Sequence, residues 1–189
     1  VRYVTFVGAY QQAASLVRTM KQQGFTPDVY QPTVTAYTPE FIKQAGDAAE
    51  GTFVAVAPSL NEEMNGNPEL SLYAQWLNQV EPGAVPTGIG QYAWAAASLF
   101  IDKIKKIGPH LTRQALLAQL PGERAYTGNG LFPPNDVGGR TLSDCTSVVQ
   151  VKSAAFVRHT PPQIRGLRCG DGIWDSKAKR AITAGPGGH

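Results

Sequence analysis

The sequence is poor in the features that mark specialised classes of protein. It contains two cysteines and two methionines in 189 residues. Its longest apolar run, Ala93 to Ile101, stops at Asp102 and falls well short of the roughly 20 apolar residues that span a bilayer. Charge of one sign is also scarce, because 17 basic and 14 acidic residues leave a net charge of +3 without a long basic block. We therefore expect a globular chain of one large domain or two small lobes, without a nucleic-acid partner.

Motifs that carry chemistry are also absent. The three histidines, His110, His159 and His189, lack the spacing of metal ligands. There is neither a G-x-S-x-G turn nor a phosphate-binding loop. Residues 88–93 match G-x-G-x-x-A, but no strand precedes them and no acidic residue follows about 20 positions later. We interpret them as the start of a helix, and we expect neither catalysis, nor a cofactor, nor a metal.

The two cysteines, Cys145 and Cys169, do not form a C-x-x-C pair. Their separation suits a disulfide in a part of the chain that is rich in loops. Such a bond would add about 3 kcal/mol in the loop-entropy model and would indicate an oxidising compartment. The alternative is two unrelated buried thiols.

Residues 1–24 are typical of a strand, a turn and a helix. Val1 to Val7 is rich in β-branched and aromatic residues, and Gly8 interrupts the run. From Gln11 the apolar residues recur at helical spacing until Gly24. This unit predicts an open α/β sheet.

Ligands of open α/β sheets bind beyond the carboxyl ends of the strands. In this chain that position falls on Gly8, Ala9 and Tyr10. Tyr10 offers both a ring and a hydroxyl to a small ligand. The alternative is a half-buried tyrosine with a structural role.

The later pattern extends the α/β order. The turn residues and the periodicity predict strands over 28–31, 52–57, 147–152 and 155–159, and helices over 39–45, 68–80, 91–107 and 111–120. The β-α-β-α-β order of the first part favours parallel strands. Residues 81–90 form a Pro/Gly-rich linker, the tail from Pro161 is loop-like, and residues 183–189 are expected to be disordered.

Three stretches resemble the type I periplasmic binding proteins, in particular the leucine/isoleucine/valine-binding branch of the receptors that serve ABC transporters. They are FVGAYQQAASLVRTMKQQGF, QAGDAAEGTFVAVAP and GQYAWAAASLFIDKIKKIG. The resemblance covers residues 1–157. It implies the parallel-sheet, three-layer lobe of a two-lobed fold that is incomplete in this chain. The chain begins at Val1 within a strand and corresponds to the later half of the family.

The resemblance also implies a division of the chain. Residues 1–84 correspond to the α/β segment of the second lobe, and residues 85–127 to helices that return to the first lobe. Residues 128–160 are the closing strands. Residues 161–189 are a C-terminal extension, partly disordered. The missing N-terminal half would then be a partner of this chain, and without it we expect the chain to be unstable or to associate.

Site residues follow from the resemblance position by position. The tyrosine with which the family contacts its ligands matches Tyr10, preceded by Gly8 and Ala9. The acidic residue that pairs the ammonium of an amino acid is replaced by Thr33, which cannot neutralise a cation. Either Tyr37 and its loop fulfil this role differently, or the ligand lacks an ammonium group.

At the crossing between the lobes, the ligand contact falls near Pro86, in an apolar wall. The implied function is an extracytoplasmic receptor, periplasmic or at the cell surface with or without a lipid anchor, whose precursor carries a signal peptide. Its lobes would close on a small, amino-acid-like or related molecule and deliver it to a membrane permease. The alternative is the ligand-sensing domain of a receptor or regulator with the same fold.

Overall fold

The first unit of the chain is a parallel β-α-β unit. The computed structural model describes residues 1–170, 173–175 and 180–182. Strand β1 (Tyr3–Phe6) is followed by helix α1 (Tyr10–Gln22) and strand β2 (Val29–Pro32). The two strands run parallel, with Tyr3 opposite Val29. The predicted strand, turn and helix are therefore confirmed.

The remaining strands pair antiparallel, in sheets that are separate from the parallel pair of β1 and β2. Helix α2 (Pro39–Ala45) leads to β3 (Phe53–Val56), which pairs with β4 (Ser147–Lys152). Strand β4 forms an antiparallel hairpin with β5 (Ala155–Thr160). We expected a parallel arrangement that continued through β3. Instead β3 lies beside β2 without pairing with it. Its hydrogen-bonded partner is β4, which comes from far along the chain.

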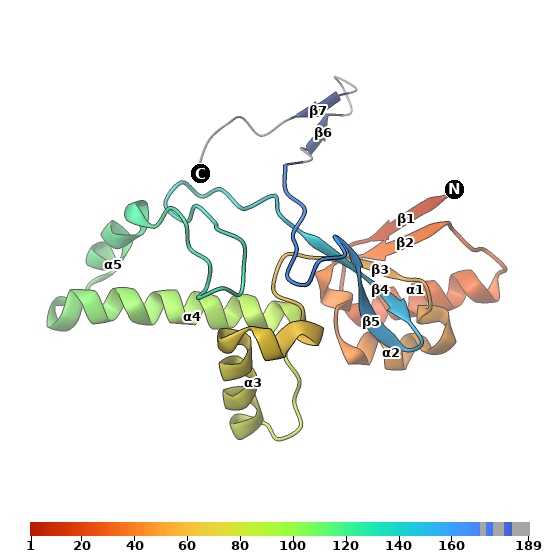
Figure 1. Ribbon diagram of the computed structural model, residues 1–189, viewed down its shortest axis with the longest axis horizontal. Coiled ribbons are helices and arrows are strands. Elements are labelled where there is room, and N and C mark those ends of the chain that lie inside the picture. The colour runs from red at the N-terminus through yellow and green to blue at the C-terminus, as the bar shows by residue number, and fades with distance from the viewer. Residues whose placement is uncertain (171–172, 176–179, 183–189) are drawn as a thin grey trace.

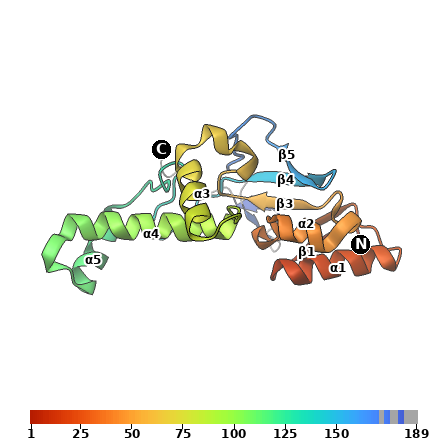
Figure 2. The same cartoon turned by 90° about the horizontal axis from the view of Figure 1, so that it is seen from below.

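The main core lies between the strands and the helices α1 and α2. In Figure 2 both helices lie on the same side of β3 and β4. Small residues of α1, Ala13 and Ala14, are fully buried and allow close packing. The hydroxyl of Tyr30 in β2 donates a hydrogen bond of 2.9 Å to the carbonyl of Ala13. Phe41 of α2 is also fully buried. This core fixes the carboxyl ends of β1 and β2 relative to each other.

Three helices extend away from the sheet. They are α3 (Pro68–Val80), the long α4 (Gly88–Ile107) and α5 (Arg113–Gln119), which lies near the far end of α4 in Figure 1. A small second core joins α3 to α4, with the rings of Tyr73 and Trp94 5.3 Å apart. No helix in the described part of the chain is long and apolar enough to cross a membrane.

Helix α4 begins three residues earlier than the sequence indicated. The Thr87 hydroxyl accepts a hydrogen bond of 3.0 Å from the amide of Gly90, so that residues 88–90 form the first turn. We had assigned these glycines to the linker because glycine is a weak helix former. The cap at Thr87 and tight packing overcome that preference. A Cβ at Gly88 would lie 2.9 Å from the Val34 side chain.

The C-terminal tail contains regular structure that the sequence did not predict. Strands β6 (Ile173–Asp175) and β7 (Arg180–Ile182) pair antiparallel. The expectation of a loop-like tail is therefore wrong at these residues, because backbone pairing in so short a hairpin leaves little pattern in the sequence. The expected disorder of residues 183–189 lies outside the described residues.

The main core gives the first prediction. Replacing Phe41 with alanine should lower the free energy of unfolding by about 3–5 kcal/mol, because the fully buried ring leaves a cavity. Chemical denaturation measures the change. Phe25→Ala is the matched control, since that ring is 39% exposed and should contribute much less. Equal losses in the two variants would contradict this description of the core.

Candidate functional site

A cavity lies where β1 and β2 end, and we call it the strand-end cavity. It has a volume of about 290 Å³. Its walls come from the start of α1, the loop after β2 and the start of α4. The lining residues are Ala9, Tyr10, Gln11, Val34, Thr35, Tyr37, Thr38, Thr87, Gly88 and Ile89. The position matches the carboxyl edge at which open α/β sheets bind ligands.

The two loops of this cavity are held together by threonines. The Thr35 hydroxyl donates a hydrogen bond of 2.5 Å to the carbonyl of Gly8, and the Thr33 amide donates one of 3.0 Å to the carbonyl of Phe6. The hydroxyls of Thr33 and Thr35 lie 3.0 Å apart. Glycine at position 8 lets the ring of Phe6 pack close, because a Cβ there would lie 2.8 Å from that ring and would force it to shift.

The structure places the expected site residues in three groups. Ala9 and Tyr10 line the strand-end cavity, and Tyr10 is the half-buried first residue of α1. Gly8 and Thr33 lie behind that wall and contribute to its hydrogen bonds rather than to its lining. Pro86 lines the neighbouring cavity described below.

Tyr37 forms the partition between the strand-end cavity and that neighbour. Its side chain is almost fully buried. Its hydroxyl donates a hydrogen bond of 2.5 Å to Oε2 of Glu62 and accepts one of 2.8 Å from the amide of Asn61. Burial and the adjacent carboxylate raise the pKa of Tyr37 well above its ordinary value, so it stays protonated. The ring packs edge-on against Phe156 at 5.0 Å.

The neighbouring cavity has a volume of about 310 Å³, and we call it the Glu62 cavity. It is lined by Tyr37, Thr38, Pro39, Asn61, Glu62, Met64, Val85, Pro86 and Phe156. Burial raises the pKa of Glu62, although the hydrogen bond from Tyr37 partly opposes this shift. Sequence reasoning missed both Glu62 and Asn61. The available signal was a polar stretch directly after a buried strand, which we had treated as an irregular connection.

Amide side chains join the segments that connect the sheet to α3 and α4. The side-chain amide of Asn61 donates a hydrogen bond of 2.7 Å to the carbonyl of Pro86. Gln91 is fully buried and donates to the carbonyl of Ser59 at 2.9 Å and to Oδ1 of Asn61 at 3.2 Å. Asn67 donates to Oγ of Ser59 at 2.8 Å. The connection after β3 and the segment that leads into α4 are therefore fixed to each other beside Tyr37.

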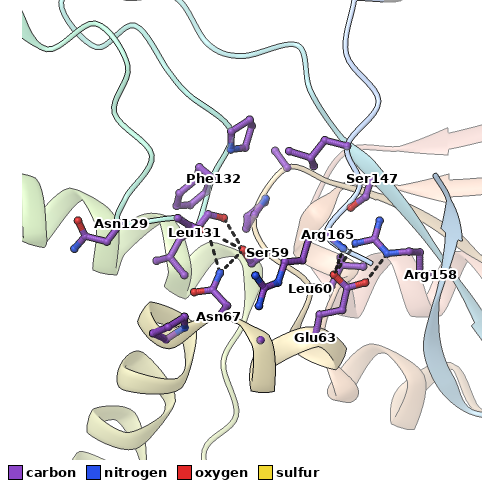
Figure 3. A pocket seen from close by; sticks show the side chains of 17 residues that line it. Ser59, Leu60, Glu63, Asn67, Asn129, Leu131, Phe132, Ser147, Arg158 and Arg165 are labelled. Atoms are coloured by element: carbon purple, nitrogen blue, oxygen red, sulfur yellow. Dashed lines mark hydrogen bonds and ion pairs between the residues drawn. The ribbon is translucent and has the colours of Figure 1, made fainter. Parts of the chain in front are cut away.

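A third cavity, about 200 Å³ in volume, is lined in part by the connection between β3 and α3 (Figure 3). An ion pair forms part of its wall. Nε of Arg158 lies 2.5 Å from Oε1 of Glu63, and both side chains are about nine-tenths buried. Arg158 also donates to the carbonyl of Gly166 at 2.8 Å, and the amide of Arg165 donates to Glu63 at 2.8 Å. This pair holds the start of the C-terminal extension against the connection after β3.

The extension has a second attachment further along. Cys145 and Cys169 form a disulfide, and Thr146 pairs with Arg168 through two backbone hydrogen bonds of 2.9 and 2.8 Å. The amide of Gly170 donates to the Asp144 carboxylate at 3.0 Å. Residues 161–170 are loop-like, as the sequence predicted, and they pack on the body of the protein through the disulfide that the sequence also predicted.

The strand-end cavity combines polar groups with apolar side chains. Tyr10, Thr35 and Thr87 offer hydroxyls and a ring around an apolar floor. Within residues 1–170, 173–175 and 180–182, no three His, Cys, Asp or Glu side chains gather as a metal site. The cavity thus offers orientation and hydrogen bonds to a small molecule.

The structure is thus an α/β lobe with a cavity at the carboxyl edge of β1 and β2. The family model described as "Periplasmic binding protein" matches residues 1–155. The chain therefore belongs to the periplasmic binding protein family. The family resemblance stated from the sequence is confirmed. No protein with a curated description matches the chain.

Several solved structures share the fold. A leucine binding protein from Thermotoga maritima is 19% identical, with a TM-score of 0.66 over 84% of this chain and 44% of its own. A possible leucine/isoleucine/valine-binding protein from Rhodopirellula baltica is 14% identical, with a TM-score of 0.72 over 87% and 44%. A fatty acid ABC transporter substrate-binding protein from Thermomonospora curvata is 20% identical, with a TM-score of 0.68 over 82% and 41%. The chain spans less than half the length of these structures.

The buried ion pair gives the second prediction. Arg158→Ala should destabilise the protein by about 3 kcal/mol, because it leaves the Glu63 carboxylate without its partner. Arg124→Ala, which breaks the exposed pair with Asp136, is the control and should have a small effect. Chemical denaturation of both variants measures the difference.

The ion pair of Arg158 and Glu63 also makes the stability of the protein depend on pH. Burial acts to raise the pKa of Glu63, but hydrogen bonds from Arg158 and Arg165 outweigh it, so the pKa lies below its ordinary value. A carboxyl whose pKa is lowered in the folded state stabilises the protein above its unfolded pKa, and this contribution is lost as the pH falls through the folded pKa. The loss of unfolding free energy in Arg158→Ala should therefore become smaller on acidification. A loss that is constant from neutral to acidic pH would contradict this assignment.

Proposed function

We propose that the protein is an extracytoplasmic solute-binding receptor that delivers a small organic ligand to the permease of an ABC transporter. The observation that carries the proposal is the strand-end cavity, where Tyr10 and Tyr37 meet at the carboxyl edge of β1 and β2. Membership of the periplasmic binding protein family supports the same class of function. In this proposal Tyr10 contacts the ligand directly, and Gly8 and Thr33 hold its loop.

We propose an amino-acid-like or related ligand. Proteins with the same fold include a leucine binding protein and a fatty acid ABC transporter substrate-binding protein. The fold therefore leaves the ligand open, and the residues of the site must decide it. Thr33 is neutral and its hydroxyl is shared with Thr35. The strand-end cavity consequently provides hydrogen bonds rather than a negative charge, and Pro86 adds an apolar wall on the adjoining side.

The proposed compartment is extracytoplasmic. A disulfide is the relevant observation, because such bonds persist in oxidising compartments and are rare in the cytosol. The bond links Cys145 to Cys169 and thereby fastens the extension to the segment before β4. Release of the ligand to a permease would follow from opening of the closed form, whose population the ligand sets by its differential affinity.

We further propose that the remaining part of a two-lobed fold covers α3, α4 and α5. Large apolar side chains on these helices are exposed to an unusual degree. Exposed fractions are 51% for Trp76, 42% for Tyr92, 48% for Phe100, 44% for Ile101 and 50% for Leu117. A set of such residues on neighbouring helices marks an interaction surface. The solved structures of this fold extend over more than twice the matched length.

Ligand binding gives the third prediction. In the full-length protein, Tyr10→Ala should weaken binding of a ligand found in a panel of amino acids and related acids and amides by tenfold or more, or about 1.4 kcal/mol. The ring and hydroxyl lining the cavity would be lost. Calorimetric titration measures the affinity. Tyr3→Ala is the control, because Tyr3 lies on β1 away from the cavity and is 52% exposed. Equal affinities for Tyr10→Ala and the unaltered protein would refute the site.

The exposed helices give the fourth prediction. The 189-residue chain on its own should self-associate or unfold over a broad range, since its apolar helix faces meet water. Substituting Phe100 and Ile101 by polar residues should reduce self-association of this chain. Light scattering and thermal melting check both expectations. A monomer with a sharp two-state melt would contradict the proposal that these faces are covered in the complete fold.

A further inference from the structure

The Glu62 cavity combines one carboxyl group with a largely apolar wall. Glu62 reaches it from the connection after β3, and its carboxyl receives one hydrogen bond from another side chain, the Tyr37 hydroxyl at 2.5 Å. Around it lie two aromatic rings and the thioether of Met64, while Val85 and Pro86 close the side toward α4. The cavity is thus polar at one point and apolar elsewhere.

Among the described residues, Glu62 forms no ion pair. Arg158 acts on Glu62 from a distance and slightly favours its ionised form, but it forms its ion pair with the adjacent Glu63. Glu63 itself adds negative potential at Glu62. Glu62 as a residue is exposed, but its carboxyl lies among apolar side chains, and a carboxylate in such surroundings is poorly solvated. A cation that enters the cavity would offset this poor solvation.

The walls are suited to a cation with a short carbon chain. The rings of Tyr37 and Phe156 lie edge-on at 5.0 Å and both line the cavity. Aromatic faces attract organic cations, and a thioether and proline carbons accept methylene groups. With a volume of about 310 Å³, the cavity has room for a small organic group. A hydrated inorganic cation would gain nothing from these apolar walls.

We propose that the Glu62 cavity binds an alkylammonium group, with the ammonium on the Glu62 carboxylate and its carbon chain against Tyr37, Met64 and Phe156. This assignment rests on the proposed function, because Tyr37 and Thr38 line both this cavity and the strand-end cavity. A ligand in the strand-end cavity would extend its cationic end past Tyr37. Glu62 is then the residue that selects for positive charge.

The proposal predicts a dependence on pH. Burial raises the pKa of Glu62 above its ordinary value, so acidification protonates it early. The other groups facing it are the Tyr37 hydroxyl, which stays protonated, Glu63, and Arg158 on β5. Since the cation binds the ionised carboxylate, its affinity should fall as the pH drops through the pKa of Glu62. Binding below that pKa should release a proton.

The experiment uses the two methionines of the chain as reporters. The full-length protein is labelled with ¹³C on the methionine methyl groups and titrated with n-butylammonium chloride, with n-butanol as the neutral probe. Met64 lines the cavity, whereas Met20 is buried in the main core and serves as the internal control. Butylammonium should shift the Met64 signal in a saturable manner, and butanol should bind at least tenfold more weakly.

Glu62→Gln is the decisive variant, because its amide oxygen still accepts the Tyr37 hydrogen bond while the charge is removed. It should reduce the affinity for butylammonium at least tenfold and abolish its pH dependence. Glu81→Gln, which removes a charge at the end of α3, should change neither. Met64 shifts that are equal for both probes, or that persist in Glu62→Gln, would overturn the proposal. The readout needs no physiological ligand, so it stands apart from the Tyr10→Ala result that tests the proposed function.

Discussion

The buried hydroxyl of Tyr37 is the contact on which the arrangement of the site depends. It lies in a water-poor position and is hydrogen-bonded both to Glu62 and to the amide of Asn61. A buried hydroxyl without partners would be costly, so the loop after β2 and the connection after β3 must lie together. Asn61 extends the constraint to Pro86 and Gln91. The sheet edge and the start of α4 are thereby held around the two adjoining cavities.

Two adjacent glutamates show how the surroundings decide the role of a side chain. Glu63 faces Arg158 and the amide of Arg165, and these donors keep its pKa low. Glu62 faces an apolar cavity, and burial raises its pKa. One carboxylate fastens the C-terminal extension, and the other stays available on the opposite side of the same short connection. The sequence pair itself contains no sign of this division, because both residues are equally polar.

Local patterns predicted the elements of this fold better than their pairing. The strand, turn and helix of residues 1–24 follow from residue types over a few positions. The pairing of β3 with β4 joins residues nearly a hundred positions apart, and no local pattern encodes it. The site divides in the same way. Tyr10 follows directly from the strand-turn-helix order, whereas Glu62 and Asn61 become part of the site only through the burial of Tyr37.

The position of a ligand site and its chemistry are therefore determined by different parts of the chain. Parallel pairing of β1 with β2 and the close approach at Gly8 create the strand-end cavity regardless of what it holds. In the proposed site, charge selection comes from side chains on the irregular connections, because these residues can differ without disturbing the hydrogen bonds between the strands. In this chain the carboxylate that meets those conditions is Glu62, because it combines a cavity, an apolar surround and the absence of an ion pair among the described residues.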